Sequence, residues 1–256
     1  MRPVRILQLI NVPWWNACAY YAVSLSEGLA RRGHAVIVAG MKNSPAMERA
    51  KGLGLRTEDS LHLTGFNPVL LGRSLKRLRQ LLDRERIDLI NAHRAEGHVF
   101  GALASRQAGR PVPVVRTRGD VRPPKNNLFN RILHQQWTER IIIPGDFMRA
   151  NGFFPFSLSS EKVVTIPSGV DVRSFHPSWK GAPLRRKLNI DEKISMVGIV
   201  ARLSPGKGHR TFLQAAARVL RSHPETSFLV SGEEVEVKVE ELRNLARNLG
   251  IEKKVI

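Results

Sequence analysis

The sequence is poor in cysteine, in aromatic residues and in acidic residues. Cys18 is the only cysteine among 256 residues, which excludes an internal disulfide and a zinc site built from cysteines. A reducing compartment such as the cytoplasm is therefore expected. Acidic residues number 22 against 41 lysines and arginines, so the formal charge is +19. A charge of this size predicts an anionic partner, which could be a nucleic acid, a membrane surface or an acidic substrate.

Long apolar runs are also missing. No stretch approaches the roughly 18 consecutive apolar residues of a membrane span. Arg2 and Arg5 precede a short apolar run, and Ala17-Cys18-Ala19 imitates a signal-peptide cleavage site. The run at 6–10 is too short for a signal peptide, so residues 4–10 are interpreted as a first buried strand. We expect a protein that is soluble or peripheral to a membrane.

What the sequence does contain is a regular alternation of short apolar runs and amphipathic stretches. The predicted strands are 4–10, 35–39, 87–91, 112–116, 140–143, 162–166, 195–201 and 227–231. The predicted helices are 19–32, about 71–85, 95–107, 207–222 and 235–249. This alternation predicts a doubly wound α/β protein with a parallel sheet and right-handed crossovers. Ligands of such folds bind at the carboxyl ends of the strands.

The alternation pauses between the first and second parts of the chain. Residues 171–193 are rich in proline and in basic residues, and they predict a linker between a domain at 1–170 and a second one at 194–256. The first domain is long enough to be complete. The second holds about two strand–helix units, a poor independent core. We therefore expect a partial second domain. Either the sequence is a fragment of a longer chain, or its second half packs against a structure that the sequence does not contain.

One loop carries two cations between a predicted strand and the following helix. In residues 198–208, Arg202 lies at the strand tip and Lys207 is predicted in the first turn of the helix. Free N–H groups and the helix dipole favour anions there, so the pair suits a diphosphate. Gly208 follows Lys207 where a Walker A loop requires serine or threonine. The alternative interpretation is a solvated lysine in a glycine-rich turn.

Three segments together identify a family resemblance. They are residues 198–208, the Pro-x-Gly-Val-Asp segment at 167–171 and the helix end at 29–36. In order and spacing they resemble family four of the glycosyltransferases, which are retaining enzymes with the two-domain GT-B fold. The resemblance implies two Rossmann-like domains, a nucleotide-sugar donor bound between them, and no metal or other cofactor. It implies that Arg202 and Lys207 hold the donor diphosphate and stabilise charge on the leaving nucleotide.

The first predicted domain departs from the family pattern at two places. Where the family has Gly-Gly after the first strand, this chain has Asn16 and Ala17, which puts a close backbone approach to the substrate in doubt. Where the family has a histidine that contacts the transferred sugar, this chain has Arg118 or Gly119. Asp120 could supply hydrogen bonds there together with Arg118.

Two more residues complete the predicted substrate-binding set. His93 follows the predicted strand at 87–91 and has a family-like position, although a histidine at a strand end is as often structural. The resemblance also places Gly169 of the Pro-x-Gly-Val-Asp segment in the set. The family's pair of donor-binding glutamates is missing, because Glu233 and Glu241 have the spacing but lie at an ordinary strand-to-helix turn.

The basic residues concentrate in the first predicted domain. Residues 73–86 form a basic amphipathic helix that could lie on an anionic membrane, although most such helices are solvated faces. Arg122 and Lys125 could contact an anionic acceptor such as a phosphorylated or acidic sugar. The family resemblance implies work at the cytoplasmic face of the membrane on lipid-linked or lipopolysaccharide acceptors.

The sequence as a whole predicts a glycosyltransferase that moves a sugar from a nucleotide-sugar onto an anionic cell-envelope glycan or lipid-linked acceptor. We expect it in the cytoplasm, peripheral to the inner face of the membrane. The first alternative is a truncated, non-catalytic remnant that binds acceptor or membrane only. A weaker alternative is a nucleic-acid-binding protein, but helix-turn-helix, RNP and zinc-finger signals are missing and aromatic residues make up only 6%.

Overall fold

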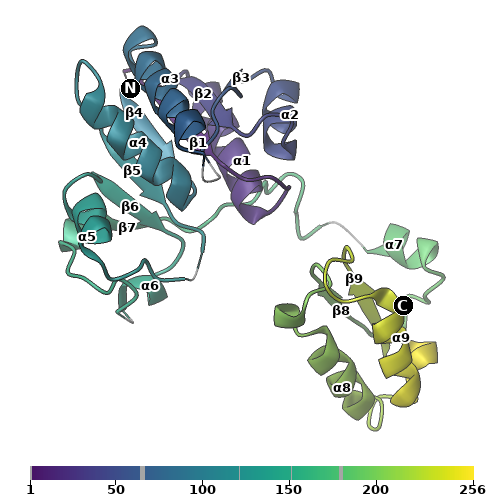
Figure 1. The fold of residues 1–256 in the computed structure, drawn as a ribbon. Coiled ribbons are helices and arrows are strands. Elements are labelled where there is room, and N and C mark those ends of the chain that lie inside the picture. The colour runs from purple at the N-terminus through teal and green to yellow at the C-terminus, as the bar shows by residue number, and fades with distance from the viewer. Residues whose placement is uncertain (1, 64–66, 121, 151, 179–180) are drawn as a thin grey trace. The chain divides into compact units, whose positions relative to one another are not determined.

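The computed structural model describes the whole chain apart from residues 1, 64–66, 121, 151 and 179–180 (Figure 1). The chain divides into two compact units, Met1–Gly169 and Val170–Ile256. Each unit has its own parallel sheet and its own apolar core.

The first unit is built on a seven-stranded parallel sheet. Its strands are β1 (Arg5–Ile10), β2 (Ala35–Gly40), β3 (Arg56–Glu58), β4 (Leu89–Ala92), β5 (Val114–Thr117), β6 (Arg140–Ile143) and β7 (Val163–Thr165). They lie in the order β3-β2-β1-β4-β5-β6-β7. From the central pair of β1 and β4, the chain proceeds outward in both directions. This pair is therefore the topological switch point, outside whose carboxyl ends such sheets bind ligands.

Helices cover both faces of this sheet. They are α1 (Ala17–Arg31), α2 (Pro45–Gly52), α3 (Pro68–Arg84), α4 (Ala95–Gln107), α5 (Leu128–Gln135) and α6 (Phe147–Ala150). Figure 1 shows α1 and α2 on one side of the sheet and α3 and α4 on the other. Two apolar clusters fill the two sides, one around Ile10, Ala22 and Val38 and the other around Leu9, Leu78 and Ile90.

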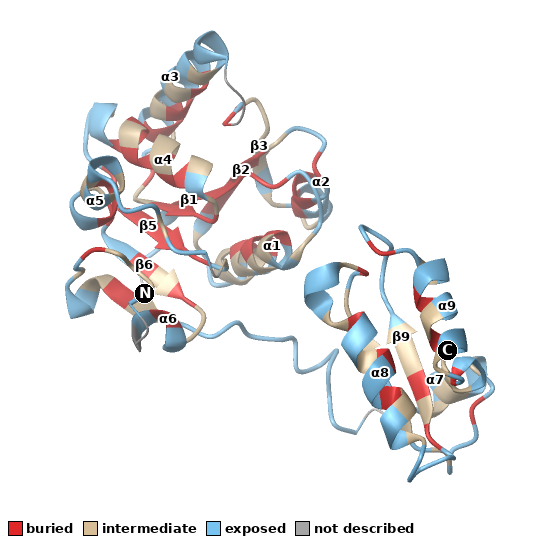
Figure 2. Cartoon of the chain, turned by 60° about the horizontal axis from the view of Figure 1, so that its bottom comes forward, coloured by how far each residue is buried: buried red, intermediate tan, exposed pale blue. Residues whose placement is uncertain are grey.

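Local sequence explains where these helices begin and which face they bury. Asn16 is extended, and its Oδ1 accepts a hydrogen bond from the backbone N–H of Ala19 at 3.0 Å, which starts α1. Gly33, at φ +85°, follows the end of α1. In α3, Leu78 and Leu82 are buried and Arg73 and Arg77 are exposed, as expected of a basic amphipathic helix (Figure 2).

The second unit is smaller. Its strands β8 (Met196–Val200) and β9 (Ser227–Ser231) pair in parallel, and its helices are α7 (Ala182–Lys187), α8 (His209–Val219) and α9 (Val239–Asn248). Leu213 of α8, Phe228 of β9 and Leu242 of α9 form its core. Helix α7 lies inside the segment predicted as a linker. Among the described residues of both units, no helix has the length and apolar character needed to cross a bilayer.

Candidate active site

A cavity of about 130 Å³ lies at the carboxyl edge of the first sheet, beside the switch point. Its lining comes from the start of α1, from the last residues of β5 and β6, and from the segments that follow β4, β5, β6 and β7. The lining residues are Ala17, Cys18, Tyr21, His93, Thr117, Arg118, Gly119, Ile142, Ile143, Pro144, Ile166 and Ser168. The structure thus brings together four residues that the sequence analysis selected: Ala17, His93, Arg118 and Gly119.

The remaining selected residues of the first unit lie next to this lining. Asn16 caps α1 immediately before Ala17, so its side-chain oxygen is already engaged. Asp120 bonds to Arg118, and Gly169 follows the lining residue Ser168 at the end of the unit.

His93 is held in this cavity as a neutral imidazole. Its side chain is almost fully buried, and its Nε2 lies 2.8 Å from Oε1 of Gln8 in β1. Burial lowers the pKa of His93 to about 3, and the positive charge of Arg116 adds to the effect. The ring meets that of Tyr21 nearly edge-on, at a centroid distance of 6.1 Å. His93 is therefore suited to hydrogen bonding and unsuited to carrying a positive charge.

Two buried arginines bring positive charge to the same edge. Arg116 Nη1 donates to the carbonyl oxygen of Ala92 at 3.0 Å, and burial lowers the pKa of Arg116 to about 10. Arg118 lies over the ring of Phe153 at 4.9 Å and donates to Asp120 Oδ1 at 2.9 Å. Asp120 also lies 3.6 Å from Arg116, and its side chain is 42% exposed. One half-exposed carboxylate thus faces two buried guanidinium groups, which leaves an excess of positive charge suited to an anion.

Unsatisfied polar atoms gather at this edge as well. Among the described residues of the first unit, buried side-chain atoms without a hydrogen-bond partner occur in Gln8, Asn11, Glu96 and Arg118. Gln8 lies in the second half of β1, Asn11 directly after β1 and Arg118 directly after β5, whereas Glu96 lies in the first turn of α4. Buried polar groups in native proteins are nearly always paired. Gln8 and Asn11 thus bring unpaired polar atoms to β1, a strand of the switch point, and Arg118 brings one to the cavity lining.

Several residues of this cavity were not selected from the sequence. Gln8 interrupts an apolar strand run, and this interruption was the available signal for a polar group under the cavity. Thr117, a lining residue, donates a hydrogen bond to Oδ1 of Asn91 at 2.8 Å, and both residues are buried. Cys18 donates weakly to the carbonyl oxygen of His93 at 3.5 Å. Burial raises the pKa of the Cys18 thiol, so it is a poor nucleophile.

The second unit holds the other two selected residues, Arg202 and Lys207. Both side chains are exposed, and Arg202 follows the end of β8 as expected. The expectation that Lys207 lies in the first turn of the next helix is wrong. Lys207 closes a short 3-10 turn, and α8 begins two residues later because Gly208 intervenes with φ +80°. Gly208, the N-cap residue of α8, has no side chain to cap the helix.

Two further features surround this loop. A Cβ atom at Gly232 would lie 1.8 Å from the carbonyl oxygen of Ala201, so the loop after β8 requires glycine at the end of β9. Glu241 is engaged locally, since its Oε1 accepts from the backbone of Lys238 at 3.2 Å and its Oε2 pairs with Arg210 at 2.8 Å. These contacts agree with the interpretation of Glu241 as a helix-start residue.

Comparison with known proteins identifies the family. Residues 19–174 match the profile of Glycosyltransferase Family 4, and residues 182–256 match that of Glycosyl transferases group 1. The chain belongs to glycosyltransferase family 4, and its α/β architecture is of the GT-B type. A glycosyltransferase crystal structure from Rickettsia africae superposes with a TM-score of 0.85 at 15% identity, covering 100% of this chain and 68% of that one. The Anabaena protein Alr3699/HepE, in complex with UDP and glucose, gives a TM-score of 0.75 at 20% identity, covering 99% and 68%.

Two curated proteins are related to this chain in sequence. A D-inositol 3-phosphate glycosyltransferase of Segniliparus rotundus is 26% identical over 264 aligned positions, covering 91% of this chain and 58% of the relative. A UDP-Gal:alpha-D-GlcNAc-diphosphoundecaprenol alpha-1,3-galactosyltransferase of Escherichia coli is 24% identical over 171 positions, covering 63% of this chain and 44% of the relative. The chain thus spans about half of the length of the curated relatives it matches.

Proposed function

We propose that this protein is a retaining glycosyltransferase that moves a sugar from a nucleotide-diphosphate donor to an anionic glycan or lipid-linked acceptor of the cell envelope. The observation that carries the proposal is the family membership of both units, together with a cavity beside the switch point of the first sheet whose lining includes His93 and Arg118. The first unit takes the acceptor in this proposal, and the second takes the nucleotide.

The donor site of the proposal lies in the loop between β8 and α8. Arg202 and Lys207 are exposed cations near the uncapped start of α8, where free N–H groups favour a phosphate. Their role is to bind the diphosphate and to compensate the charge that develops on the leaving nucleotide. The structural neighbour in complex with UDP and glucose supports a uridine nucleotide as the first probe. The proposed reaction needs no metal, because fixed side-chain cations supply this compensation.

The acceptor of the proposal carries a phosphate or another anionic group. Its support is the excess positive charge of Arg116 and Arg118 over Asp120 at the cavity edge. Arg122 and Lys125 are exposed on the loop that follows Asp120. The two curated relatives are named for an inositol phosphate and for a sugar linked to a lipid diphosphate, and both of these compounds are anionic.

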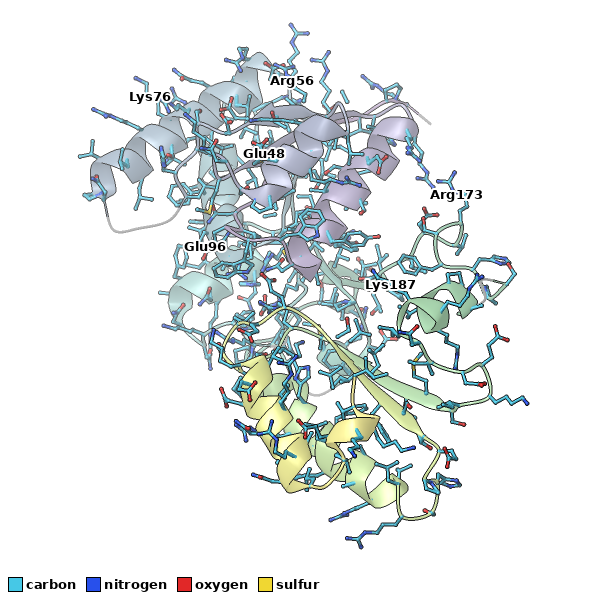
Figure 3. All side chains as sticks on the ribbon, turned by 90° about the vertical axis from the view of Figure 1, so that its right-hand side faces the viewer. Glu48, Arg56, Lys76, Glu96, Arg173 and Lys187 are labelled. Carbon is cyan, nitrogen blue, oxygen red and sulfur yellow. The ribbon has the colours of Figure 1, made fainter. Side chains whose placement is uncertain are left out.

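A peripheral contact with the inner face of the membrane belongs to the same proposal. On α3, Arg73 and Lys76 are exposed, and Figure 3 shows Lys76 directed outward from the helix. Val69 and Leu70, in the first turn of α3, are 58% and 39% exposed. Basic side chains next to exposed apolar ones are the combination that binds an anionic bilayer surface.

The proposal is tested by UDP binding to the full-length protein in the presence of EDTA, measured by calorimetry. We expect Arg202→Ala and Lys207→Ala each to weaken UDP binding about tenfold or more, the usual loss for a charged hydrogen bond. Arg221→Ala is the matched control, because Arg221 is an exposed arginine of the same unit beyond the end of α8. UDP affinity unchanged in both test variants would overturn the diphosphate site. Salt-sensitive binding of oligonucleotides with no binding of UDP would favour a nucleic-acid-binding protein.

A further inference from the structure

Gln8 is a buried polar residue in the centre of an apolar strand. Both neighbours on each side in β1 are isoleucine or leucine, and Gln8 itself has no exposed surface. Burying a carboxamide is costly unless it is hydrogen-bonded. Oε1 of Gln8 lies 2.8 Å from Nε2 of His93, whereas Nε2 of Gln8 has no partner among the described residues. Its bond to His93 is therefore the interaction that explains a glutamine at this position.

The chemistry of this bond determines which ring nitrogen of His93 carries the proton. A carboxamide oxygen only accepts hydrogen bonds, so Nε2 of His93 must be the donor. A neutral imidazole has one N–H, which leaves a lone pair on Nδ1. The ring is neutral because burial keeps the pKa of His93 at about 3. Nδ1 has no hydrogen-bond partner within the part of the chain that the structure describes, while the ring lines the cavity.

We propose that Gln8 is a positioning residue that fixes His93 as the Nε2–H tautomer, so that Nδ1 accepts a hydrogen bond from a substrate hydroxyl in the cavity. Only the identification of this hydroxyl as part of a sugar or acceptor rests on the proposed function. The arrangement selects groups that donate a hydrogen bond. A hydroxyl can donate to the lone pair of Nδ1, whereas an ether oxygen or a carboxylate at the same place has no hydrogen to donate and its own lone pairs face that of Nδ1. Gln8 acts through His93 and lies beneath the cavity, outside its lining.

The tautomer can be measured directly in the full-length, ligand-free protein labelled with ¹⁵N-histidine. Two-bond ¹H–¹⁵N correlation spectra distinguish a protonated from an unprotonated ring nitrogen. We expect His93 of the wild type to show a protonated Nε2 and an unprotonated Nδ1 from pH 8 to pH 5. In Gln8→Met, which keeps a side chain of similar length without the acceptor, the two nitrogen shifts move toward each other as the tautomers mix. Thr138→Val is the matched control, since it removes the partner that lies 2.7 Å from Nε2 of buried His98 and leaves Gln8 in place.

The hydroxyl preference is tested with a pair of small probes on the same sample. Glycerol presents hydroxyl donors and 1,2-dimethoxyethane presents only ether oxygens. We expect glycerol to shift the Nδ1 resonance of wild-type His93 and 1,2-dimethoxyethane to leave it in place. Equal shifts with both probes, or no shift with glycerol, would overturn the hydroxyl site.

The positioning role of Gln8 has its own contrary outcomes. A wild-type His93 protonated on Nδ1, or present as imidazolium at pH 6.5, refutes it without any variant. So does an unchanged tautomer in folded Gln8→Met. If Gln8→Met does not fold, Gln8→Glu replaces it: a carboxylate beside Nε2 favours the imidazolium, whose signals should then appear between pH 7 and pH 5. None of these results depends on nucleotide binding. The role of Gln8 can therefore be refuted while the proposed UDP site is confirmed, and the UDP site can be refuted while the role of Gln8 is confirmed.

Discussion

At the scale of single residues, the first unit keeps three imidazoles buried and uncharged. Burial is the largest cause in each case: it lowers the pKa of His93 to about 3 and that of His134 to about 4, and it lowers the pKa of His98 well below its ordinary value. In the unfolded chain each histidine titrates near 6.5. Below that pH the unfolded state binds protons that the folded state does not bind. The free energy of unfolding therefore falls as the pH drops below about 6.5 and continues to fall to about 4 for His134.

Replacing His134 by phenylalanine should reduce this acid sensitivity. The His134 ring lies 5.4 Å from the ring of Phe156, in an aromatic cluster that can accept another phenyl group. At pH 4.5, His134 alone costs the wild type about 2–3 kcal/mol relative to pH 7. Urea unfolding at pH 7 and pH 4.5 should show that the free energy of unfolding of His134→Phe falls less between these pH values than that of the wild type, by about this amount. Gln136→Leu, an exposed change at the end of the same helix, is the control. If the free energy of unfolding of His134→Phe falls as much between pH 7 and pH 4.5 as that of the wild type, His134 is not a source of the acid sensitivity.

The residues of the cavity show what the sequence could reveal of the site. Family spacing pointed to His93 and Arg118, and the structure places both in one lining; their contact with substrate stays a prediction. Gln8 and Arg116 were not selected, because their importance comes from cross-strand neighbours. Gln8 and Asn91 are directly paired between β1 and β4, and Arg116 pairs with Ala92 between β4 and β5. One-dimensional periodicity does not reveal which strands are neighbours.

At the scale of elements, the fold of both units was largely predictable. Eight predicted strands are confirmed, each to within two residues at its ends, and α4 is confirmed at 95–107. The central strands of the first unit are apolar because the sheet buries them, whereas β8 is apolar although none of its residues is buried. The structure adds β3, whose three residues Arg56–Glu58 include no apolar side chain, and α2 and α5, which are only eight residues long. Such short elements depend on tertiary neighbours more than on local pattern.

The close contact between α4 and the sheet gives a prediction at this scale. A Cβ atom at Gly101 would lie 3.1 Å from Leu9 Cδ1 and 3.2 Å from Ile90 Cγ2, both in the core. Gly101→Val should therefore overpack this layer and lower the free energy of unfolding by about 1–3 kcal/mol. Gly72→Val is the matched control in α3, where a Cβ atom meets nothing within 4 Å, and a slight stabilisation is expected from helix propensity. Urea unfolding followed by circular dichroism measures both. Equal stability of the two variants would mean that α4 does not pack this tightly.

At the scale of the whole molecule, the positive charge cannot be neutralised internally. With 41 basic and 22 acidic residues, even complete pairing leaves an excess. On α3, Arg84 pairs with Glu85 at 2.8 Å, and Arg77 donates to the carbonyl oxygen of Ser60 at 3.0 Å. Arg73 and Lys76 have no carboxylate or carbonyl partner among the described residues and are exposed. These two side chains therefore test attraction to an anionic surface without disturbing a structural bond.

We expect the protein to bind vesicles containing anionic phospholipid, and to bind them more weakly as salt is raised, because attraction to a charged bilayer is screened beyond about 8–10 Å at physiological ionic strength. The double variant Arg73→Gln/Lys76→Gln should weaken binding roughly 30-fold, at about 1 kcal/mol for each basic residue near the surface. Arg218→Gln/Arg221→Gln removes the same charge from exposed positions at the end of α8 and should change binding much less. Vesicle sedimentation measures all three proteins. Equal losses of vesicle affinity in the two double variants would show that net charge alone drives binding, without a dedicated surface on α3. If the protein binds neutral vesicles as strongly as anionic ones, the electrostatic contact is refuted.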